Sequence, residues 1–265
     1  MNQDFIAKHW YASVYEQFET QTDDVDFLLR TLKTQTDGSP QTILEVACGG
    51  GRICVPLAQA GHDVTGFDAD EQMLLRCVRR GKGLPNLRVY QAEATTADWG
   101  SGYDVVVLGG NLLINIESPM DYAQAQQLFL RKAATALKPG GHLWLDFDLH
   151  ADPAKVFHRL REGSCFEGTD ELGTTGRTMY YGSVYNPVTQ ICTGTNHVEL
   201  TTSSGQRLIL PEVWHKHIPT LGQVLVWLAD AGLAVEQVCK NFTPEPLTEP
   251  LGSDTWRATV WACKQ

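Results

Sequence analysis

The sequence predicts an α/β fold, in which a doubly wound parallel sheet is followed by an inserted antiparallel β-sheet. Over the first half of the chain, short apolar segments alternate with helical patterns. One of these segments, Ile43–Val46, leads into the consecutive glycines Gly49, Gly50 and Gly51. From about residue 177 to 217 the alternation stops, and three β-like runs follow one another with only turns between them.

The strands expected in the parallel sheet are short apolar segments with many branched side chains: Thr42–Ala47, Asp63–Asp68, Leu87–Ala92, Asp104–Leu108 and His142–Asp148. Helical patterns lie between them, over Gly51–Ala60, Asp70–Arg80 and Pro119–Leu137. One or two further helices are expected ahead of the sheet, within Met1–Gln35. Strands that alternate with helices indicate a parallel sheet with its ligand at the carboxyl ends of the strands.

Local signals place the ends of two helices. Pro56 lies near the start of the first helix, where its missing N–H costs little. Ser118 is the expected N-cap of the third helix and Pro119 its first residue. The segment Lys138–Gly141 is expected to end that helix and to turn into the next strand.

The antiparallel region contains the β-runs Arg177–Tyr185, Gln190–Thr202 and Gln206–His217, separated by the turn-like NPVT and SSG. A helix over Leu221–Ala231 and strands over Leu233–Cys239 and Arg257–Cys263 then close the fold. The predicted organisation is therefore an N-terminal helical lid (1–40), a cofactor-binding core (41–150), the β-insertion (151–217) and a closing segment (218–265).

Composition narrows the class of partner. The chain has 31 acidic and 21 basic residues, and its net charge of −10 argues against a nucleic-acid partner. No apolar run has the length of a membrane span, and MNQDFIAKHW lacks the pattern of a signal peptide. Seven cysteines at irregular spacing indicate reduced thiols rather than a disulfide framework. We therefore expect a cytoplasmic protein that acts on a small molecule, without nucleic-acid or membrane partners.

The glycine turn indicates a cofactor that contains a nucleoside. Gly49, Gly50 and Gly51 let the backbone turn sharply and approach a ligand, since they carry no Cβ. Asp68 ends the next apolar segment, where a carboxylate can accept hydrogen bonds from a ribose diol. The dinucleotide fingerprint also requires a third glycine, but Cys54 occupies that position. A nicotinamide oxidoreductase is therefore disfavoured.

The segment ILEVACGGGR resembles motif I of the class I S-adenosylmethionine-dependent methyltransferases, with Ala47 where that family often has glycine. Four further segments resemble the family's later motifs in the same order, and together they cover Thr42–Phe147: VTGFDADEQML, VYQAEATTADW, YDVVVLGGNLLINI and LKPGGHLWLDF. The LGGNLLINI segment is similar to the loop of glycine and sugar N-methyltransferases, which are small-molecule enzymes. The resemblance implies a seven-stranded Rossmann-like sheet whose last strand is antiparallel.

The resemblance also implies S-adenosyl-L-methionine as cofactor. It places eleven residues around that cofactor: Glu45, Ala47, Gly49, Gly51, Arg52, Asp68, Ala69, Met73, Glu93, Ala94 and Gly110. Asp68 would bind the ribose, Glu93 and Ala94 the adenine edge, and Glu45 the ammonium group of the methionine part. Met73 would pack on the adenine ring. For Arg52 the expected partner is a carboxylate from the N-terminal region or a neighbouring loop.

Three residues are predicted to serve catalysis. HWYASVYEQF resembles the N-terminal helix whose tyrosine closes over the methyl donor in small-molecule methyltransferases, which implies Tyr15. The LGGN segment places Asn111 near the methionine part, and His150 stands after the fifth strand, where a base for the acceptor could lie. No metal site is expected, since no ligand cluster accompanies His215 and His217.

Cys48 in the glycine turn is interpreted as a small filler of the core. The aromatic and imidazole side chains of the insertion could line an acceptor cavity, pack on the parent sheet or form a homodimer contact: Tyr180, Tyr181, Tyr185, His197, Trp214 and His215. The favoured function is methyl transfer to a small-molecule acceptor, with nitrogen slightly preferred over oxygen. The alternatives are another reaction of the same cofactor, such as cyclisation or transfer of another group, and cofactor binding without catalysis.

Overall fold

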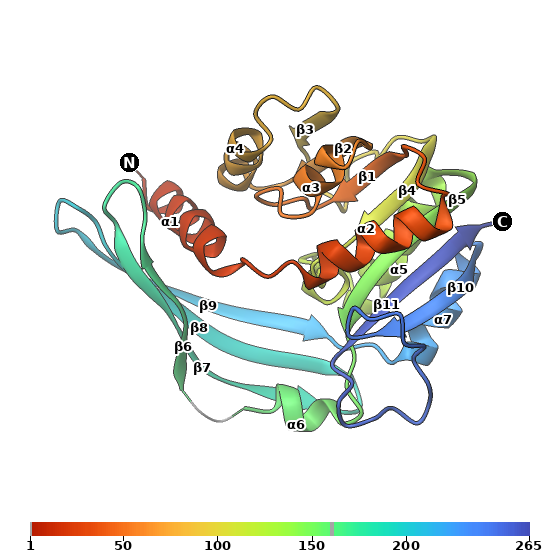
Figure 1. The fold of residues 1–265 in the computed structure, drawn as a ribbon. Coiled ribbons are helices and arrows are strands. Elements are labelled where there is room, and N and C mark those ends of the chain that lie inside the picture. The colour runs from red at the N-terminus through yellow and green to blue at the C-terminus, as the bar shows by residue number, and fades with distance from the viewer. Residues whose placement is uncertain (1, 160–161) are drawn as a thin grey trace. The chain divides into compact units, whose positions relative to one another are not determined.

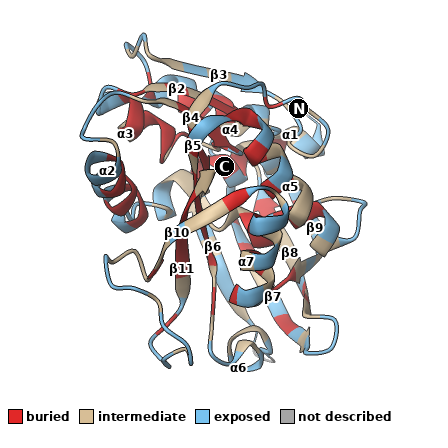
Figure 2. Cartoon of the chain, turned by 90° about the vertical axis from the view of Figure 1, so that its right-hand side faces the viewer, coloured by how far each residue is buried: buried red, intermediate tan, exposed pale blue. Residues whose placement is uncertain are grey.

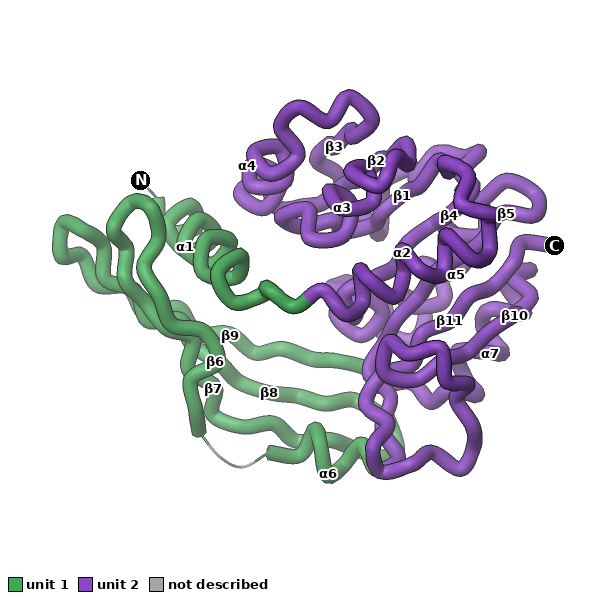
Figure 3. The backbone as a smooth tube through the Cα atoms, in the orientation of Figure 1, with its two compact units in different colours: residues 1–21, 152–217 green, residues 22–151, 218–265 purple. Residues whose placement is uncertain are grey.

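The computed structural model describes residues 2–159 and 162–265, which form two compact units (Figures 1 and 3). Unit 1 consists of Met1–Gln21 and Asp152–His217, and unit 2 of Thr22–Ala151 and Ile218–Gln265. The boundary after Gln21 divides the predicted N-terminal segment 1–40, because its two helices fall into different units.

Unit 2 contains a seven-stranded sheet in the order β10-β11-β5-β4-β1-β2-β3. Its strands are β1 (Thr42–Val46), β2 (Asp63–Asp68), β3 (Leu87–Gln91), β4 (Tyr103–Leu108), β5 (Leu137–Asp148), β10 (Leu233–Lys240) and β11 (Arg257–Lys264). The five strands from β3 to β5 in this order pair in parallel, whereas β11 is antiparallel to both of its neighbours. The predicted fold class is confirmed, including the antiparallel last strand.

Helices cover both faces of this sheet: α2 (Asp23–Gln35) and α3 (Cys54–Gln59) lie on one side, and α5 (Tyr122–Ala136) and α7 (Leu221–Asp230) on the other (Figure 2). The buried cluster on the first face joins Leu28 of α2, Leu57 of α3 and Trp144 of β5, and also takes in Leu74 and Cys77 of α4 (Glu71–Arg80). Within residues 2–159 and 162–265, no helix combines the length and apolar character needed to cross a membrane.

Three predicted elements begin at least three residues away from the expected position. Helix α3 begins at Cys54 rather than at Gly51, because the glycine turn occupies the residues before it. Helix α5 begins at Tyr122, because Asp121 is its N-cap and accepts a hydrogen bond from the Gln124 N–H at 3.1 Å. The Ser118 hydroxyl instead accepts the Met120 N–H, which closes a tight turn before the helix. Strand β5 begins at Leu137 rather than at His142, because Leu137 pairs with Tyr103 ahead of a register shift. Pairing with a neighbouring strand thus extended β5 through a segment whose sequence indicates a turn.

Unit 1 contains a four-stranded antiparallel sheet, β6 (Gly163–Thr169), β7 (Thr175–Asn186), β8 (Ile191–Thr201) and β9 (Arg207–His217). It confirms the predicted antiparallel insertion and adds β6, which the sequence did not indicate. The unit also includes α1 (Gln3–Phe18) and the short α6 (Pro153–Phe157). Trp10 of α1 is buried with Leu200 and Leu208 of this sheet, and its indole N–H donates to the Gly168 carbonyl at 3.0 Å.

The glycine turn after β1 is packed closely at one position. Gly51 has φ +81°, and a Cβ built there would lie 2.7 Å from Cys77 Sγ and 2.9 Å from Val55 Cγ2. Gly61 also has a left-handed φ, +96°, but no atom lies within 4 Å of its added Cβ. The two glycines therefore share the backbone requirement, and only Gly51 lacks space for a side chain.

We expect Gly51→Ala to lower the free energy of unfolding by about 2–5 kcal/mol, since left-handed strain adds to overpacking. Gly61→Ala is the matched control and should cost about 1–2 kcal/mol from strain alone. Urea unfolding of both variants measures the difference. Equal losses in the two variants would show that contact with Cys77 and Val55 does not require glycine at position 51.

Candidate active site

The turn between β1 and α3 exposes its backbone on one side. Ala47, Gly49 and Gly51 all have left-handed φ values, 56°, 51° and 81°. A non-glycine residue in this region costs roughly 1–2 kcal/mol, so Ala47 is a strained exception. No atom lies within 4 Å of a Cβ added at Gly49, which leaves room for a ligand beside the main chain. Gly49 thus has the open side that its predicted cofactor-binding role requires, and the roles predicted for Ala47 and Gly51 stay predictions.

Asp68, at the end of β2, is held against this turn. Its Oδ2 accepts the Gly49 N–H and its Oδ1 accepts the Asp70 N–H, both at 2.8 Å. Burial raises the pKa of Asp68, while the hydrogen bonds from Asp70 and Gly49 act in the opposite direction. Each carboxylate oxygen can accept more than one hydrogen bond, so the oriented group keeps acceptor capacity for a diol.

The loop after β3 holds the predicted adenine-contact residues. Glu93 accepts hydrogen bonds from the N–H of Thr95 at 3.1 Å and from its hydroxyl at 2.9 Å. The Ala94 carbonyl accepts the Trp99 indole N–H at 2.9 Å and the Lys132 ammonium at 2.8 Å. Lys132 also donates to the carbonyls of Thr95 and Ala97, so a helix of the opposite face fixes this loop. No sequence signal pointed to Lys132, which lies 38 residues beyond Ala94.

Arg52 has the kind of partner that the sequence predicted. Its guanidinium donates two hydrogen bonds of 2.6 Å to the two carboxylate oxygens of Asp24, near the start of α2. Such a bidentate pair is strongly directional. A Cβ added at Gly110 would lie 3.7 Å from Arg52 Nη2, so the loop after β4 passes beside the same guanidinium. Asp24 confirms the expected N-terminal carboxylate, and direct contact between Arg52 and the cofactor stays a prediction.

Asn111 connects the loop after β4 to the end of β5. It has a left-handed φ of +64°. Its N–H donates to Asp146 Oδ1 at 2.9 Å, and its side-chain amide donates to Asp148 Oδ2 at 2.9 Å. The Asp148 N–H in turn donates to Asn111 Oδ1 at 2.8 Å. The structure therefore uses the Asn111 side chain to orient Asp148, and its predicted contact with the methionine part remains untested.

Arg257 of β11 completes this group of charges. Its guanidinium contacts Asp146 at 2.8 Å and Asp148 at 3.0 Å. The same guanidinium lies over the Phe242 and Trp256 rings, 5.6 and 5.5 Å from their centroids. Sequence reasoning missed Arg257, Asp146 and Asp148, because the strands that carry them become neighbours only in the folded sheet.

Among the buried carboxyl groups with an oxygen atom that no described residue hydrogen-bonds are two in the core of unit 2, with the free atoms Glu45 Oε2 and Asp146 Oδ2. Burial raises the pKa of Glu45 well above its usual range, with the electrostatic effect of Cys77 adding to it. Burial also raises the pKa of Asp146 to about 6, although Arg257 opposes the shift. Buried acceptors of this kind are costly unless a ligand or water satisfies them. Glu45 was predicted to bind an ammonium group, and its unpartnered oxygen fits that prediction.

The remaining predicted residues lie on several elements. The Ala69 carbonyl accepts the Gln91 side-chain amide at 2.8 Å, and Met73 lies in the first turn of α4. His150 follows β5 by two residues and is partly buried. Tyr15 belongs to unit 1, where its ring stacks on Tyr11 with centroids 5.8 Å apart. The roles predicted for these four residues stay predictions.

The polar and aromatic side chains of the insertion contact one another within unit 1. The Tyr181 hydroxyl lies 2.6 Å from His197 Nδ1, and His197 Nε2 lies 2.7 Å from Glu199 Oε1. The Trp214 ring occupies the space beside Gly194, where an added Cβ would lie 2.1 Å from it. His215 Nδ1 lies 2.9 Å from the Thr193 hydroxyl. These contacts pack the four-stranded sheet itself.

Comparison with known proteins gives the family of the core. Residues 43–141 match a family described as "Methyltransferase domain". A ubiquinone biosynthesis O-methyltransferase of Chelativorans sp. (strain BNC1) is 34% identical over 107 residues, which cover 39% of this chain and 38% of that protein. The chain therefore matches less than half the length of this curated relative, and the same holds for further O-methyltransferases of that name.

Solved structures share the fold over nearly the whole chain. An amino pentose methyltransferase from Micromonospora echinaspora, solved with S-adenosylmethionine bound, has a TM-score of 0.65 at 15% identity and covers 100% of this chain and 98% of its own. A sugar N-methyltransferase from Streptoalloteichus sp. ATCC 53650 has a TM-score of 0.68 at 17% identity, covering 93% of this chain and 90% of its own. At these identities the likeness establishes the fold.

The raised pKa of Asp146 predicts a specific pH dependence of stability. Because the folded-state pKa of about 6 exceeds the ordinary value of 3.8, this carboxyl stabilises the fold fully below pH 3.8. That contribution is lost as the pH rises through 6. Relative to Asp146→Asn, the wild-type protein should lose about 3 kcal/mol of unfolding free energy between about pH 3 and pH 7. Urea unfolding of both proteins over this range measures it, and parallel pH profiles would contradict the assignment.

Proposed function

We propose that this chain, whose residues 43–141 match the family described as "Methyltransferase domain", is a class I S-adenosylmethionine-dependent methyltransferase that transfers the methyl group of this cofactor to an amine nitrogen of a small molecule. The observation that carries the cofactor assignment is the contact of Asp68 with the Gly49 N–H at 2.8 Å. This hydrogen bond joins the oriented carboxylate of Asp68, at the end of β2, to the open glycine turn at the end of β1.

The residues present fit the cofactor in three respects. The open side of Gly49 lets backbone N–H groups reach a carboxylate, and Asp68 has acceptor capacity for a ribose diol. Glu45 has a buried oxygen that an ammonium group can satisfy. The Ala94 loop is fixed by Lys132 and Trp99, so its backbone can be presented to the adenine edge without further ordering. When bound, S-adenosylmethionine supplies an electrophilic methyl group on a sulfonium.

The charge near the end of β5 supports a basic acceptor. Three carboxylates, Asp24, Asp146 and Asp148, pair with two guanidinium groups, Arg52 and Arg257, which leaves one net negative charge. Negative charge in a poorly solvated site favours a cationic amine over a neutral alcohol. Two of the solved structures with this fold carry the names of an amino pentose methyltransferase and a sugar N-methyltransferase, and the second name agrees with this preference. O-methylation is the second candidate, since the curated relatives include O-methyltransferases.

Methyl transfer places few chemical demands on the protein. It is a displacement in which the enzyme aligns the two reactants and excludes water. We assign alignment to the glycine turn, Asp68 and Glu45. A protonated amine must lose a proton before it can attack, and His150 is the residue we assign as its base. Tyr15 is assigned to closing the site over the methyl donor.

All seven cysteines are free thiols, which is the usual state in a reducing compartment. We therefore infer a cytoplasmic protein that takes a small-molecule acceptor. A homodimer is retained as a prediction, and light scattering of the purified chain tests it.

Asp68→Ala should weaken S-adenosylmethionine affinity at least ~10-fold, because hydrogen bonds to a charged acceptor contribute about 1.5–3 kcal/mol each. Asp63→Ala, at the other end of β2, is the control and should leave affinity unchanged. Isothermal titration calorimetry of both variants measures the effect. Unchanged affinity in the Asp68 variant would contradict the ribose assignment, and preferential binding of NAD by the wild type would overturn the choice of cofactor.

Incubation with methyl-labelled S-adenosylmethionine and matched pairs of amino sugars and their hydroxyl analogues should label the amines. A metabolite extract treated in the same way, followed by identification of labelled products, extends the search beyond sugars. Label in hydroxyl compounds alone would favour O-methylation. Cofactor binding with no labelled product would favour a binding protein or another reaction of the cofactor.

The same assay tests the assigned catalytic residues. Tyr15→Phe and His150→Ala should lower turnover while cofactor affinity is retained, since neither is assigned to cofactor binding. Wild-type turnover in both variants would remove these residues from the mechanism.

A further inference from the structure

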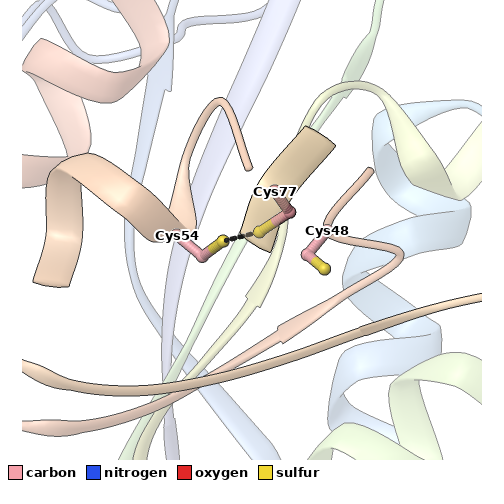
Figure 4. A group of neighbouring side chains, drawn as sticks. All are labelled: Cys48, Cys54 and Cys77. Carbon is pink, nitrogen blue, oxygen red and sulfur yellow. Dashed lines mark hydrogen bonds between the residues drawn. The ribbon is translucent and has the colours of Figure 1, made fainter. Parts of the chain in front are cut away.

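Three cysteines from separate elements meet beneath the glycine turn (Figure 4). Cys48 lies in the turn after β1, Cys54 is the first residue of α3, and Cys77 lies on α4. Their Sγ atoms all lie within 4.8 Å of one another, and those of Cys54 and Cys77 are 3.5 Å apart. All three side chains are buried. The sequence placed Cys48 in the turn and Cys54 at the position of a third glycine, but it did not indicate that the three thiols meet.

The spacing of these sulfur atoms suits a metal ion. A d¹⁰ cation such as Zn²⁺ binds thiolate sulfur at about 2.3 Å, which sets the distance between two sulfur ligands at about 3.8 Å in a tetrahedral site. The Sγ atoms of Cys54 and Cys77 are 3.5 Å apart, close to this value, and Cys48 Sγ lies within 4.8 Å of both. Small rotations of the three side chains would therefore bring them into the coordination distance.

Glu45, on β1, is not a ligand of this site. Its buried Oε2 is the atom assigned above to the ammonium group of the cofactor. No carboxylate oxygen belongs to the group of atoms that lie within 4.8 Å of one another, so the described residues supply three sulfur ligands. A Zn²⁺ ion held by three protein ligands takes a water molecule in its fourth position.

The surroundings limit the cost of the charge. Zn²⁺ with three thiolates carries a net charge of −1. Arg80 lies three residues after Cys77 on α4, so its guanidinium is on the same side of that helix as the thiol. Binding deprotonates the thiols, and these protons pass to solvent.

We propose that Cys48, Cys54 and Cys77 form a binding site for Zn²⁺ under the glycine turn. Such a site links β1, α3 and α4 through one ion. Cys48 directly precedes Gly49, whose N–H donates to Asp68. The ion would therefore hold the backbone that presents the turn to its ligand.

A second group of ligand-type side chains provides an internal control. His142, Glu236 and Cys263 come from β5, β10 and β11 and also lie within 4.8 Å of one another. His142 Nε2 already contacts Glu236 Oε2 at 3.2 Å, and Glu236 is largely exposed. Adventitious metal would bind there more readily than in the buried cluster, so the experiment must distinguish the two places.

The test titrates the reduced, metal-free protein with Cd²⁺, whose bonds to sulfur absorb in the ultraviolet. We expect one equivalent to bind, to absorb with the intensity of three thiolates, and to be displaced by Zn²⁺. Cys54→Ala and Cys77→Ala should weaken Cd²⁺ binding at least ~10-fold, since even the loss of a group that only supports a ligand costs that much. Cys239→Ala, another buried thiol of unit 2, and Cys263→Ala should leave binding unchanged.

X-ray absorption of the zinc-loaded wild type gives a result that does not depend on how the variants fold. Three sulfur neighbours and one oxygen neighbour are expected. Absorbance that survives in Cys54→Ala and disappears in Cys263→Ala would place the metal at the exposed group and overturn the proposal. A folded, reduced wild-type protein that binds no Cd²⁺ would equally overturn it and leave the three thiols as packing groups.

Discussion

The left-handed backbone of the turn after β1 is the constraint on which the site depends. Only with this conformation does the Gly49 N–H point to Asp68, and only without a side chain at position 51 can Cys77 of α4 pack against the turn. The turn therefore connects the ends of strands β1 and β2 with helices α3 and α4. The strained left-handed φ of Ala47 is part of the same conformation. Close packing of the turn against α4 keeps the backbone in this conformation.

The second organising feature is the group of charges at the ends of β5 and β11. Arg257 is held by two aspartates and covered by two aromatic rings, and Asn111 ties the loop after β4 to the same aspartates. These bonds cross between strands that are far apart in the chain. They give the end of β5 a defined arrangement of charges with one carboxylate in excess, whereas the turn after β1 has open space beside Gly49.

Whether an element was predicted correctly depends on whether residues within that element carry the signal for it. Strand β2 and helix α4 were predicted well because hydrophobic periodicity and the Asp70 cap act within a few residues. Helix α5 was started too early, since Ser118-Pro119 has the composition of a cap but forms a turn, and Asp121 caps instead. Strand β6 was missed because its pairing with β7, rather than its own composition, makes it a strand.

The sequence by itself determined the class of the fold, the glycine turn, the position of Asp68 and the family of the core, because each depends on short-range pattern or on motifs in fixed order. Only the tertiary structure decided that Arg52 pairs with Asp24, 28 residues away, and that Lys132 fixes the loop at Ala94. It also decided that Asp146 meets Arg257 across 111 residues, and that Cys54 meets Cys77 across 23. Such contacts depend on which strands and helices become neighbours, and strand order is set by packing of the whole core rather than by any local segment.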